Sequence, residues 1–278
     1  MNTLSDLLYN MFADRQPAED EYLGNDGLIY CAKCHTPRQA RVEMLGKIVT
    51  PPVMCVCKRE AEVNAETDRK QREFRERVAQ MKADGFQDKA FLDYTFANDK
   101  GYNPEMEKAR LYVERWEEMR ENATGLLLWG DVGTGKTFFA GCIANALIER
   151  GVPVLMTNFA RILNTLTDLR SEERNRFIDE MNIYPLLILD DLGIERNSEF
   201  ALEQVFNVID SRYRSGKPLI VTTNLTLNEL KNPADLAHAR IYDRVLERCV
   251  PLRINNRNIR KDNAKVQMER AKALFGAT

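Results

Sequence analysis

A short apolar run at residues 125–129, GLLLW, leads directly into the glycine-rich octet GDVGTGKT at residues 130–137. An apolar segment of helical composition, FFAGCIANALIERG, follows the octet without a break. This order restricts the fold more than any other feature, because a tight glycine-rich turn must join a buried strand to a helix N-terminus. Glycines let successive backbone N–H groups turn toward phosphate oxygens, and the positive end of the helix favours the same anion. The octet therefore predicts a phosphate-binding loop.

The octet matches the pattern G-x-x-x-x-G-K-[ST] at every defined position. We expect Lys136 to bridge the β- and γ-phosphates of a nucleotide and the Thr137 hydroxyl to hold Mg²⁺. A glycine-rich turn can match this pattern by chance, but the flanking strand and helix favour the phosphate loop. The residues predicted to contact the nucleotide are Gly130, Asp131, Val132, Gly133, Thr134, Gly135, Lys136 and Thr137.

Two acidic residues, Asp190 and Asp191, directly follow the apolar run LLIL at residues 186–189. Carboxylates at the carboxyl end of a parallel strand lie in the crevice where such sheets bind ligands. Asp190 is therefore predicted to reach the Mg²⁺, and Asp191 to polarise an attacking water. A helix N-cap is the alternative, and it would explain one acid but not two.

A third polar group, Thr222, Thr223 and Asn224, closes the apolar segment KPLIV. A polar side chain delivered there is expected to contact the γ-phosphate or to orient the attacking water. Taken alone, the tripeptide TTN is equally an ordinary turn signal.

Five short apolar runs alternate with helical patterns in the second part of the chain. Continuous Leu, Ile and Val, separated by helices of about ten residues or more, indicate a parallel sheet that is buried on both faces. The expected fold class is therefore α/β, with a parallel sheet flanked by helices. The predicted strands are residues 125–129, 154–157, 186–189, 219–222 and 250–254.

In this order and spacing, the three motifs resemble those of the AAA+ ATPases, with similarity over residues 86–262. More narrowly, the chain is similar to replicative helicase loaders of the DnaC/DnaI type and to the related IstB-type transposition helper ATPases. The segments GVPVLMTNFARILNTLTD and ARIYDRVLERC and the paired aspartates support this narrower match. The resemblance implies an ATP-hydrolysing enzyme with a P-loop AAA+ fold.

The resemblance also implies roles for single residues. Lys136 and Thr137 correspond to the Walker A motif, Asp190 and Asp191 to Walker B, and Asn224 to sensor 1. Arg240 and Arg244 lie four residues apart and share one face of a predicted helix. An arginine finger for a neighbouring subunit is implied there, with Arg244 favoured and Arg240 as the alternative. Arg260 falls where these loaders carry a sensor-2-like arginine. From spacing alone, a solvated surface charge explains each arginine as well.

Only about fifty residues follow Asn224, which is too few for a full helical lid together with the last strand. A reduced lid leaves the nucleotide exposed, so a neighbouring subunit is expected to complete the site. We therefore expect a homo-oligomer when ATP and DNA are bound.

Four of the six cysteines form two close pairs, Cys31 with Cys34 and Cys55 with Cys57. Four thiolates are the ligand set of a structural, tetrahedral Zn²⁺ site. The intervening segment QARVEMLGKIVTPPVM has the pattern of a hairpin that would join the pairs. The second pair has one spacer residue instead of two, so His35 is an alternative ligand, and four free thiols are the other reading. Cys142 and Cys249 stand alone and are expected to be small buried hydrophobic residues.

The chain divides into three predicted regions. Residues 1–58 hold a short amphipathic helix and the zinc-ribbon-like module, which the resemblance to DnaI-type loaders assigns to partner binding. Residues 59–85 are polar on nearly every face and predict an exposed linker helix. Residues 86–278 form the AAA+ ATPase domain. A module that only caps the ATPase domain is the alternative for the first region.

The formal net charge is only −2, so any contact with nucleic acid must come from a local patch. The resemblance places single-stranded DNA on the segment from Arg161 to Arg170, with Asn158 and Thr165. Further basic residues gather at Arg253, Arg257, Arg260, Lys261 and Lys265. No apolar run approaches the roughly 20 residues of a membrane span, and the N-terminus lacks the features of a signal peptide, so we expect a cytoplasmic protein.

Three functions are compatible with these features. The first is an ATP-dependent loader that binds single-stranded DNA and delivers a replicative DNA helicase. The second is an IstB-like helper that assembles on duplex DNA and recruits a transposase. The third is a zinc-stapled adaptor in which nucleotide acts as a switch with little turnover.

Overall fold

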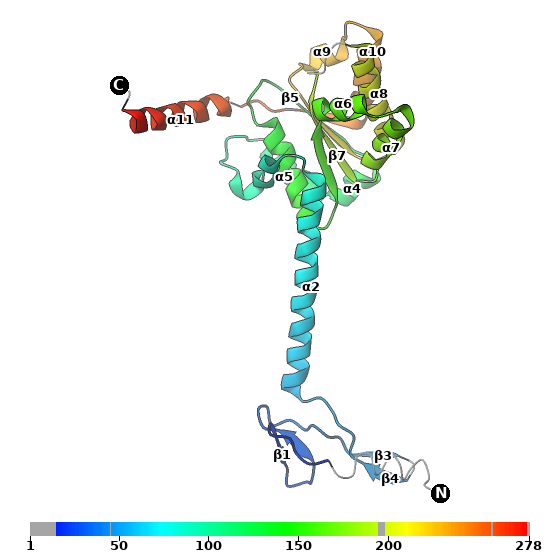
Figure 1. Ribbon diagram of the computed structural model, residues 1–278, viewed down its shortest axis with the longest axis vertical. Helices are drawn as coiled ribbons and strands as arrows, with labels where there is room; N and C mark the ends of the chain where they lie inside the picture. Colours follow the sequence, from blue (N-terminus) through cyan, green and yellow to red (C-terminus); the bar gives the residue numbers. More distant parts are fainter. Residues whose placement is uncertain (1–14, 45, 194–197, 257, 277–278) are drawn as a thin grey trace. The chain divides into compact units, whose positions relative to one another are not determined.

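The computed structural model describes residues 15–44, 46–193, 198–256 and 258–276 (Figure 1). The chain forms two compact units, Met1–Arg75 and Glu76–Thr278. The division falls inside helix α2 (Val56–Gly85), which begins three residues before the predicted linker. The amphipathic helix predicted at the N-terminus lies in residues 1–14, outside the described residues.

The N-terminal unit contains two small antiparallel hairpins. Strand β1 (Glu21–Leu23) pairs with β2 (Ile29–Cys31), and β3 (Val42–Met44) pairs with β4 (Lys47–Val49). The second hairpin confirms the one predicted between the two cysteine pairs. The buried apolar residues described in this unit are Ile29, Cys31, Val49 and Cys55. So small a core cannot by itself stabilise a unit of this size.

The C-terminal unit is built on a five-stranded parallel sheet, as predicted. The strand order is β6-β7-β8-β5-β9. The bounds are β5 Gly125–Trp129, β6 Val154–Asn158, β7 Leu186–Leu192, β8 Leu219–Thr223 and β9 Cys249–Arg253. All four pairings are parallel, so the carboxyl ends of the strands meet at one edge.

Both faces of the sheet are covered by helices (Figure 1). Leu128 and Ile188 face the cluster that includes α3, α4 and α5, whereas their neighbours Leu127 and Leu187 face the cluster of α6, α7, α8 and α10. Successive side chains of a strand point to opposite faces, which explains why the strands read as continuous apolar runs. The helices are α3 Met106–Glu114, α4 Trp116–Glu121, α5 Lys136–Glu149, α6 Phe159–Asp168, α7 Ser171–Met181, α8 Glu199–Arg214, α9 Leu227–Lys231 and α10 Leu236–Arg248.

Two short 3₁₀ helices, η1 (Lys89–Asp93) and η2 (Phe96–Asn98), connect α2 to α3. After β9 one helix follows among the described residues, α11 (Ile259–Phe275). In the described part of the chain, no helix has the length and apolar character needed to span a membrane.

Candidate functional site

The glycine-rich octet forms the turn between β5 and α5. Gly133 and Gly135 have φ values of 81° and 95°, a region that favours glycine, and Gly135 is the N-cap of α5. A Cβ atom added to Gly133 would lie 2.3 Å from Asn258 Oδ1, and one added to Gly130 would lie 2.5 Å from the Ile254 carbonyl. The glycines therefore permit both the curl of the loop and the close passage of the segment after β9.

Lys136 is buried beneath this loop, with only 5% of its surface exposed. Its Nζ donates to the carbonyls of Gly130 and Asp131 and to Asn224 Oδ1, each at 2.8 Å. Burial lowers the pKa of Lys136, and the nearby carboxylates of Asp191 and Asp190 partly oppose that shift. The structure thus brings together two residues that are 88 positions apart in the sequence.

Asp190 lies beside the Thr137 hydroxyl, which donates to its two carboxylate oxygens at 3.0 and 3.1 Å. The Thr222 hydroxyl donates to Asp190 Oδ1 at 2.6 Å. Burial raises the pKa of Asp190, and the bond from Thr222 limits the rise. A hydroxyl and a buried carboxylate in contact form an all-oxygen donor pair, which suits Mg²⁺.

Asp191 has different surroundings from its neighbour, because the backbone turns sharply between them. Its φ is 62°, an uncommon value for an aspartate, and the pairing of β7 with β8 is irregular between Leu189 and Leu192. The Asp191 N–H donates to Thr222 Oγ1 at 2.9 Å. A non-glycine residue held in this region costs on the order of 1–3 kcal/mol, and such strain clusters at functional sites. The Asp191 side chain lines a cavity next to the loop.

The cavity has a volume of about 490 Å³, within the range of small-molecule sites. One wall comes from residues 132–138 together with Asp191, Asn224 and Arg260. The opposite wall was missed by sequence reasoning, and it consists of Tyr94, Asn98, Asp99, Lys100, Tyr102, Asn103 and Met106, with Asn256 nearby. The predicted phosphate loop, second acid, sensor asparagine and Arg260 therefore converge on one cavity.

The second wall is fastened to α5 by side chains that the sequence pattern does not reveal. Asn145 Nδ2 donates to the carbonyls of Phe91 and Tyr94 at 2.7 and 2.9 Å, and the Tyr94 ring packs edge-on against Phe138 at 5.4 Å. The sequence offered one signal for this wall, the group of aromatic residues that precedes β5. Nothing in their spacing indicates that they contact a helix some fifty residues later.

The two candidate finger arginines lie on α10, away from the residues that line this cavity. Arg244 Nε donates to Asp210 Oδ1 at 2.6 Å, and its guanidinium lies 4.7 Å from the centre of the Phe206 ring. Arg240 is exposed, and its side chain has no hydrogen bond or ion pair among the residues that the structure describes. Arg240 is therefore the more available of the two guanidinium groups.

The residues predicted to contact DNA are mostly at the surface, but several have local partners. Asn158 caps α6 by accepting from the Arg161 N–H at 2.8 Å, and Arg161 Nη1 donates to the Gln87 carbonyl at 2.8 Å. Arg170 is exposed, and Arg253 lies 5.3 Å from the centre of the Trp129 ring. Arg257 lies outside the described residues.

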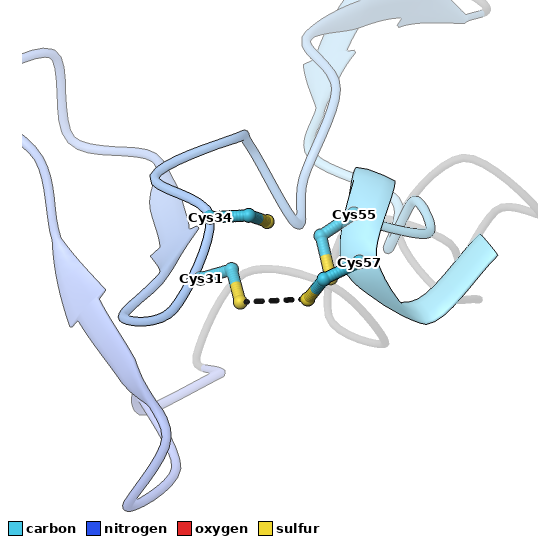
Figure 2. A group of neighbouring side chains, drawn as sticks. All are labelled: Cys31, Cys34, Cys55 and Cys57. Carbon is cyan, nitrogen blue, oxygen red and sulfur yellow. Dashed lines mark hydrogen bonds between the residues drawn. The ribbon is translucent and has the colours of Figure 1, made fainter. Parts of the chain in front are cut away.

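The four paired cysteines converge in the N-terminal unit (Figure 2). Cys31 is the last residue of β2 and Cys34 lies in the turn after it, whereas Cys55 and Cys57 stand on either side of Val56, the first residue of α2. All four sulfurs lie within 4.8 Å of one another. Four sulfurs bound tetrahedrally at 2.3 Å would lie about 3.8 Å apart, so the cluster fits a Zn²⁺ site.

Local hydrogen bonds favour the thiolate form at Cys34 but the thiol form at Cys57. A hydrogen bond with the Thr36 hydroxyl lowers the pKa of Cys34 to about 5, whereas a hydrogen bond with Cys55 raises the pKa of Cys57 to about 12. His35 is not part of the cluster, because its Nδ1 lies 3.3 Å from the Tyr22 hydroxyl. The remaining cysteines, Cys142 and Cys249, are buried as predicted.

Comparison with known proteins adds a family to this geometry. The family model described as IstB-like ATP binding protein matches residues 58–267. The replicative helicase loader DnaC of Escherichia coli (strain K12) is 29% identical over 145 residues, which are 50% of this chain and 56% of DnaC. The replicative helicase loader DnaI of Bacillus subtilis (strain 168) is 31% identical over 150 residues, which are 49% of this chain and 47% of DnaI. The chain thus spans about half the length of these curated relatives.

Solved structures give the same relation at the level of the fold. A crystal structure of the DnaC helicase loader superposes with a TM-score of 0.52 and 25% identity, and it covers 60% of this chain and 100% of that one. A crystal structure of DnaI superposes with a TM-score of 0.52 and 24% identity, and it covers 62% of this chain and 96% of that one.

Proposed function

Because this chain belongs to the IstB-like ATP-binding protein family, we propose that it is an ATP-dependent loader that delivers a replicative DNA helicase to single-stranded DNA. The observation that carries the proposal is the convergence of Lys136, Asp190 and Asn224 beneath the glycine-rich loop. The similarity to DnaC and DnaI supports helicase loading as the purpose of ATP binding.

A role for each group around a bound nucleotide follows from this proposal. Lys136 would exchange its contacts with the loop carbonyls for the β- and γ-phosphates, and it would keep Asn224 close to the γ-phosphate. Thr137 and Asp190 would hold Mg²⁺, which neutralises charge on the phosphates when it is bound. Asp191 faces the cavity and would accept a proton from the attacking water. Arg260 would contact the phosphates from the side of the reduced lid.

A second copy of the chain would complete the site in a DNA-bound homo-oligomer. Neither Arg240 nor Arg244 lines the cavity of its own chain, which agrees with a role toward a neighbour. Arg244 would first have to leave Asp210, whereas Arg240 is already exposed. We therefore place the arginine finger at Arg240 and keep Arg244 as its alternative.

The three predicted regions of the chain would have different roles in helicase loading. Residues 1–58 would bind the helicase and be stabilised by zinc at the four cysteines, residues 59–85 would act as an arm, and residues 86–278 would bind ATP and DNA. The exposed surface around Arg161 and Arg170 would contact single-stranded DNA through its phosphates, so binding should weaken steeply with salt.

A direct experiment is a loading assay on circular single-stranded DNA. The full chain is mixed with a hexameric replicative helicase, ATP and DNA coated with single-strand-binding protein, and helicase retained on the circles is measured after gel filtration. We expect retention that depends on the chain and on ATP. No interaction with the helicase, but retention of a transposase on duplex DNA, would support the IstB-type helper. Helicase binding without measurable hydrolysis would support the nucleotide-switched adaptor.

A further inference from the structure

We propose that Arg38 is a positioning residue for the four-cysteine metal site, acting through a hydrogen bond from its guanidinium to the Cys31 sulfur. The inference rests on the zinc site proposed above and adds a residue from outside the cysteine set. Its consequence is that zinc affinity depends on a polar network, and not on the four thiolates alone.

The guanidinium of Arg38 lies between the cluster and two acids. Its Nη2 is 3.6 Å from Cys31 Sγ and 2.7 Å from Asp20 Oδ2, and its Nη1 is 3.0 Å from Glu21 Oε1. The side chain is 17% exposed, so the guanidinium is largely removed from water. A planar donor with this many acceptors has one preferred orientation.

Glu21, the first residue of β1, holds this orientation. Its side chain is fully buried, and it accepts from Arg15 at 2.6 Å, from Arg38 at 3.0 Å and from the Ala18 N–H at 3.1 Å. A buried carboxylate is tolerated only when it is paired and hydrogen-bonded. Glu21 therefore fixes the position from which Arg38 reaches Cys31.

A cation at this point offsets the charge of the metal site. Four thiolates around one Zn²⁺ carry a net charge of about −2, which favours donors that point at sulfur. The Arg38 guanidinium supplies this cation at 3.6 Å from Cys31 Sγ, and an arginine side chain stays charged at any ordinary pH. Outer partners that orient metal ligands typically change metal affinity by about 10–100-fold when they are removed.

A purely structural clamp is the competing explanation, because the same network ties Arg38 to the acids of the first hairpin. The two explanations predict different electron density on the Cys31 sulfur. A clamp affects only folding, whereas a hydrogen bond to sulfur also withdraws electron density from the thiolate. The electronic state of the bound metal therefore separates them.

The test uses the full-length chain with Arg38→Met, loaded with Zn²⁺ or with Co²⁺. We expect zinc affinity to fall by about 10–100-fold in competition with a chromophoric chelator. We also expect the sulfur-to-cobalt charge-transfer band to move to lower energy, because the sulfur becomes more electron-rich. Arg41→Met is the matched control, since Arg41 is exposed in the same unit and donates to the Asp26 carbonyl at 2.7 Å; neither readout should change in this variant.

The double variant Glu21→Gln with Arg38→Met guards against misfolding, since it leaves no unpaired buried carboxylate. It should show the same loss of affinity and the same band shift as Arg38→Met. An unmoved cobalt band in either variant, whether or not zinc affinity falls, would support the structural clamp and overturn the inference. A wild-type chain that binds neither metal would instead remove the zinc site, and the ATP affinity measured in parallel would still report on the nucleotide site.

Discussion

The two compact units are stabilised by different kinds of interaction. In Glu76–Thr278, apolar side chains fill both faces of a parallel sheet, and the cavity beside the glycine-rich loop lies at the carboxyl ends of its strands. Among the described residues of Met1–Arg75, few apolar side chains are buried, and a cysteine cluster lies next to a buried ion network. An apolar core tolerates polar functional groups at its edge, whereas a small polar centre depends on every one of its contacts. The units should therefore respond independently to metal removal and to changes at the phosphate loop.

The largest expected effect is the loss of the N-terminal unit on Cys31→Ser. Zinc content should fall from about one ion per chain to none, and this unit should become sensitive to proteases, because metal binding supplies much of its folding free energy. ATP affinity should not change. Metal analysis and nucleotide titration test this, with Cys249→Ser as a control that should keep its zinc. A parallel loss of ATP affinity would show that the two units are not independent.

The reverse separation is expected for Lys136→Ala. Removing the ammonium group should weaken ATP binding by at least about 100-fold, because Lys136 is the group placed to meet the β- and γ-phosphates. Zinc content and helicase binding should stay intact. Titration with a fluorescent ATP analogue measures the change, and Lys108→Ala, at an exposed residue paired with Glu105, is the control. Unchanged ATP affinity would refute the assignment of the phosphate loop.

Arg240→Ala should leave ATP affinity intact but reduce DNA-stimulated hydrolysis by about 100-fold or more, as expected for a finger supplied to a neighbouring subunit. Mixing Arg240→Ala with Lys136→Ala should restore part of the activity, since some interfaces then combine an intact loop with an intact arginine. If Arg244→Ala shows this behaviour instead, the finger is Arg244. If neither variant loses activity, neither Arg240 nor Arg244 is the finger.

The smallest effect is expected for Asp190→Asn. Burial raises the pKa of Asp190, so ionised Asp190 destabilises the folded state. This loss of folding free energy grows as the pH rises from the ordinary pKa of an aspartate to the raised pKa of Asp190. Removing the charge should raise the melting temperature of the nucleotide-free protein by about 2–4 °C at pH 7.5, equivalent to about 1 kcal/mol. The gain should shrink at acid pH, where Asp190 is protonated. Scanning calorimetry of the nucleotide-free proteins measures this gain. The same scans with Mg²⁺–ATP should show that the variant has lost the Mg²⁺-dependent part of nucleotide binding. A lower melting temperature at every pH would contradict it.

Much of the C-terminal unit was predictable because its signals are local. A glycine-rich turn, an apolar strand and a helix are adjacent in the chain, so the octet and the five strands could be recognised without tertiary contacts. The fold class, the family and the hairpin predicted between the two cysteine pairs were confirmed. The roles of the individual site residues stay predictions.

The wall formed by Tyr94, Tyr102 and Asn103 was not predictable, and neither was the contact of Arg38 with Cys31. The cavity wall and the Arg38–Cys31 contact both form only when separate segments pack together. The sequence pattern of each segment alone does not indicate the contact. The different surroundings of Asp190 and Asp191 likewise follow from one backbone turn at the end of β7, which an adjacent pair of letters does not reveal.

By itself, the sequence determined that a phosphate loop joins a buried strand to a helix and that four cysteines gather near the N-terminus, because both depend on residues close in the chain. Only the tertiary structure decided which distant groups share the cavity, which arginine is available, and what surrounds the sulfurs. The physical reason is that backbone geometry is largely a local property, whereas burial and charge neighbours arise only when separate elements pack.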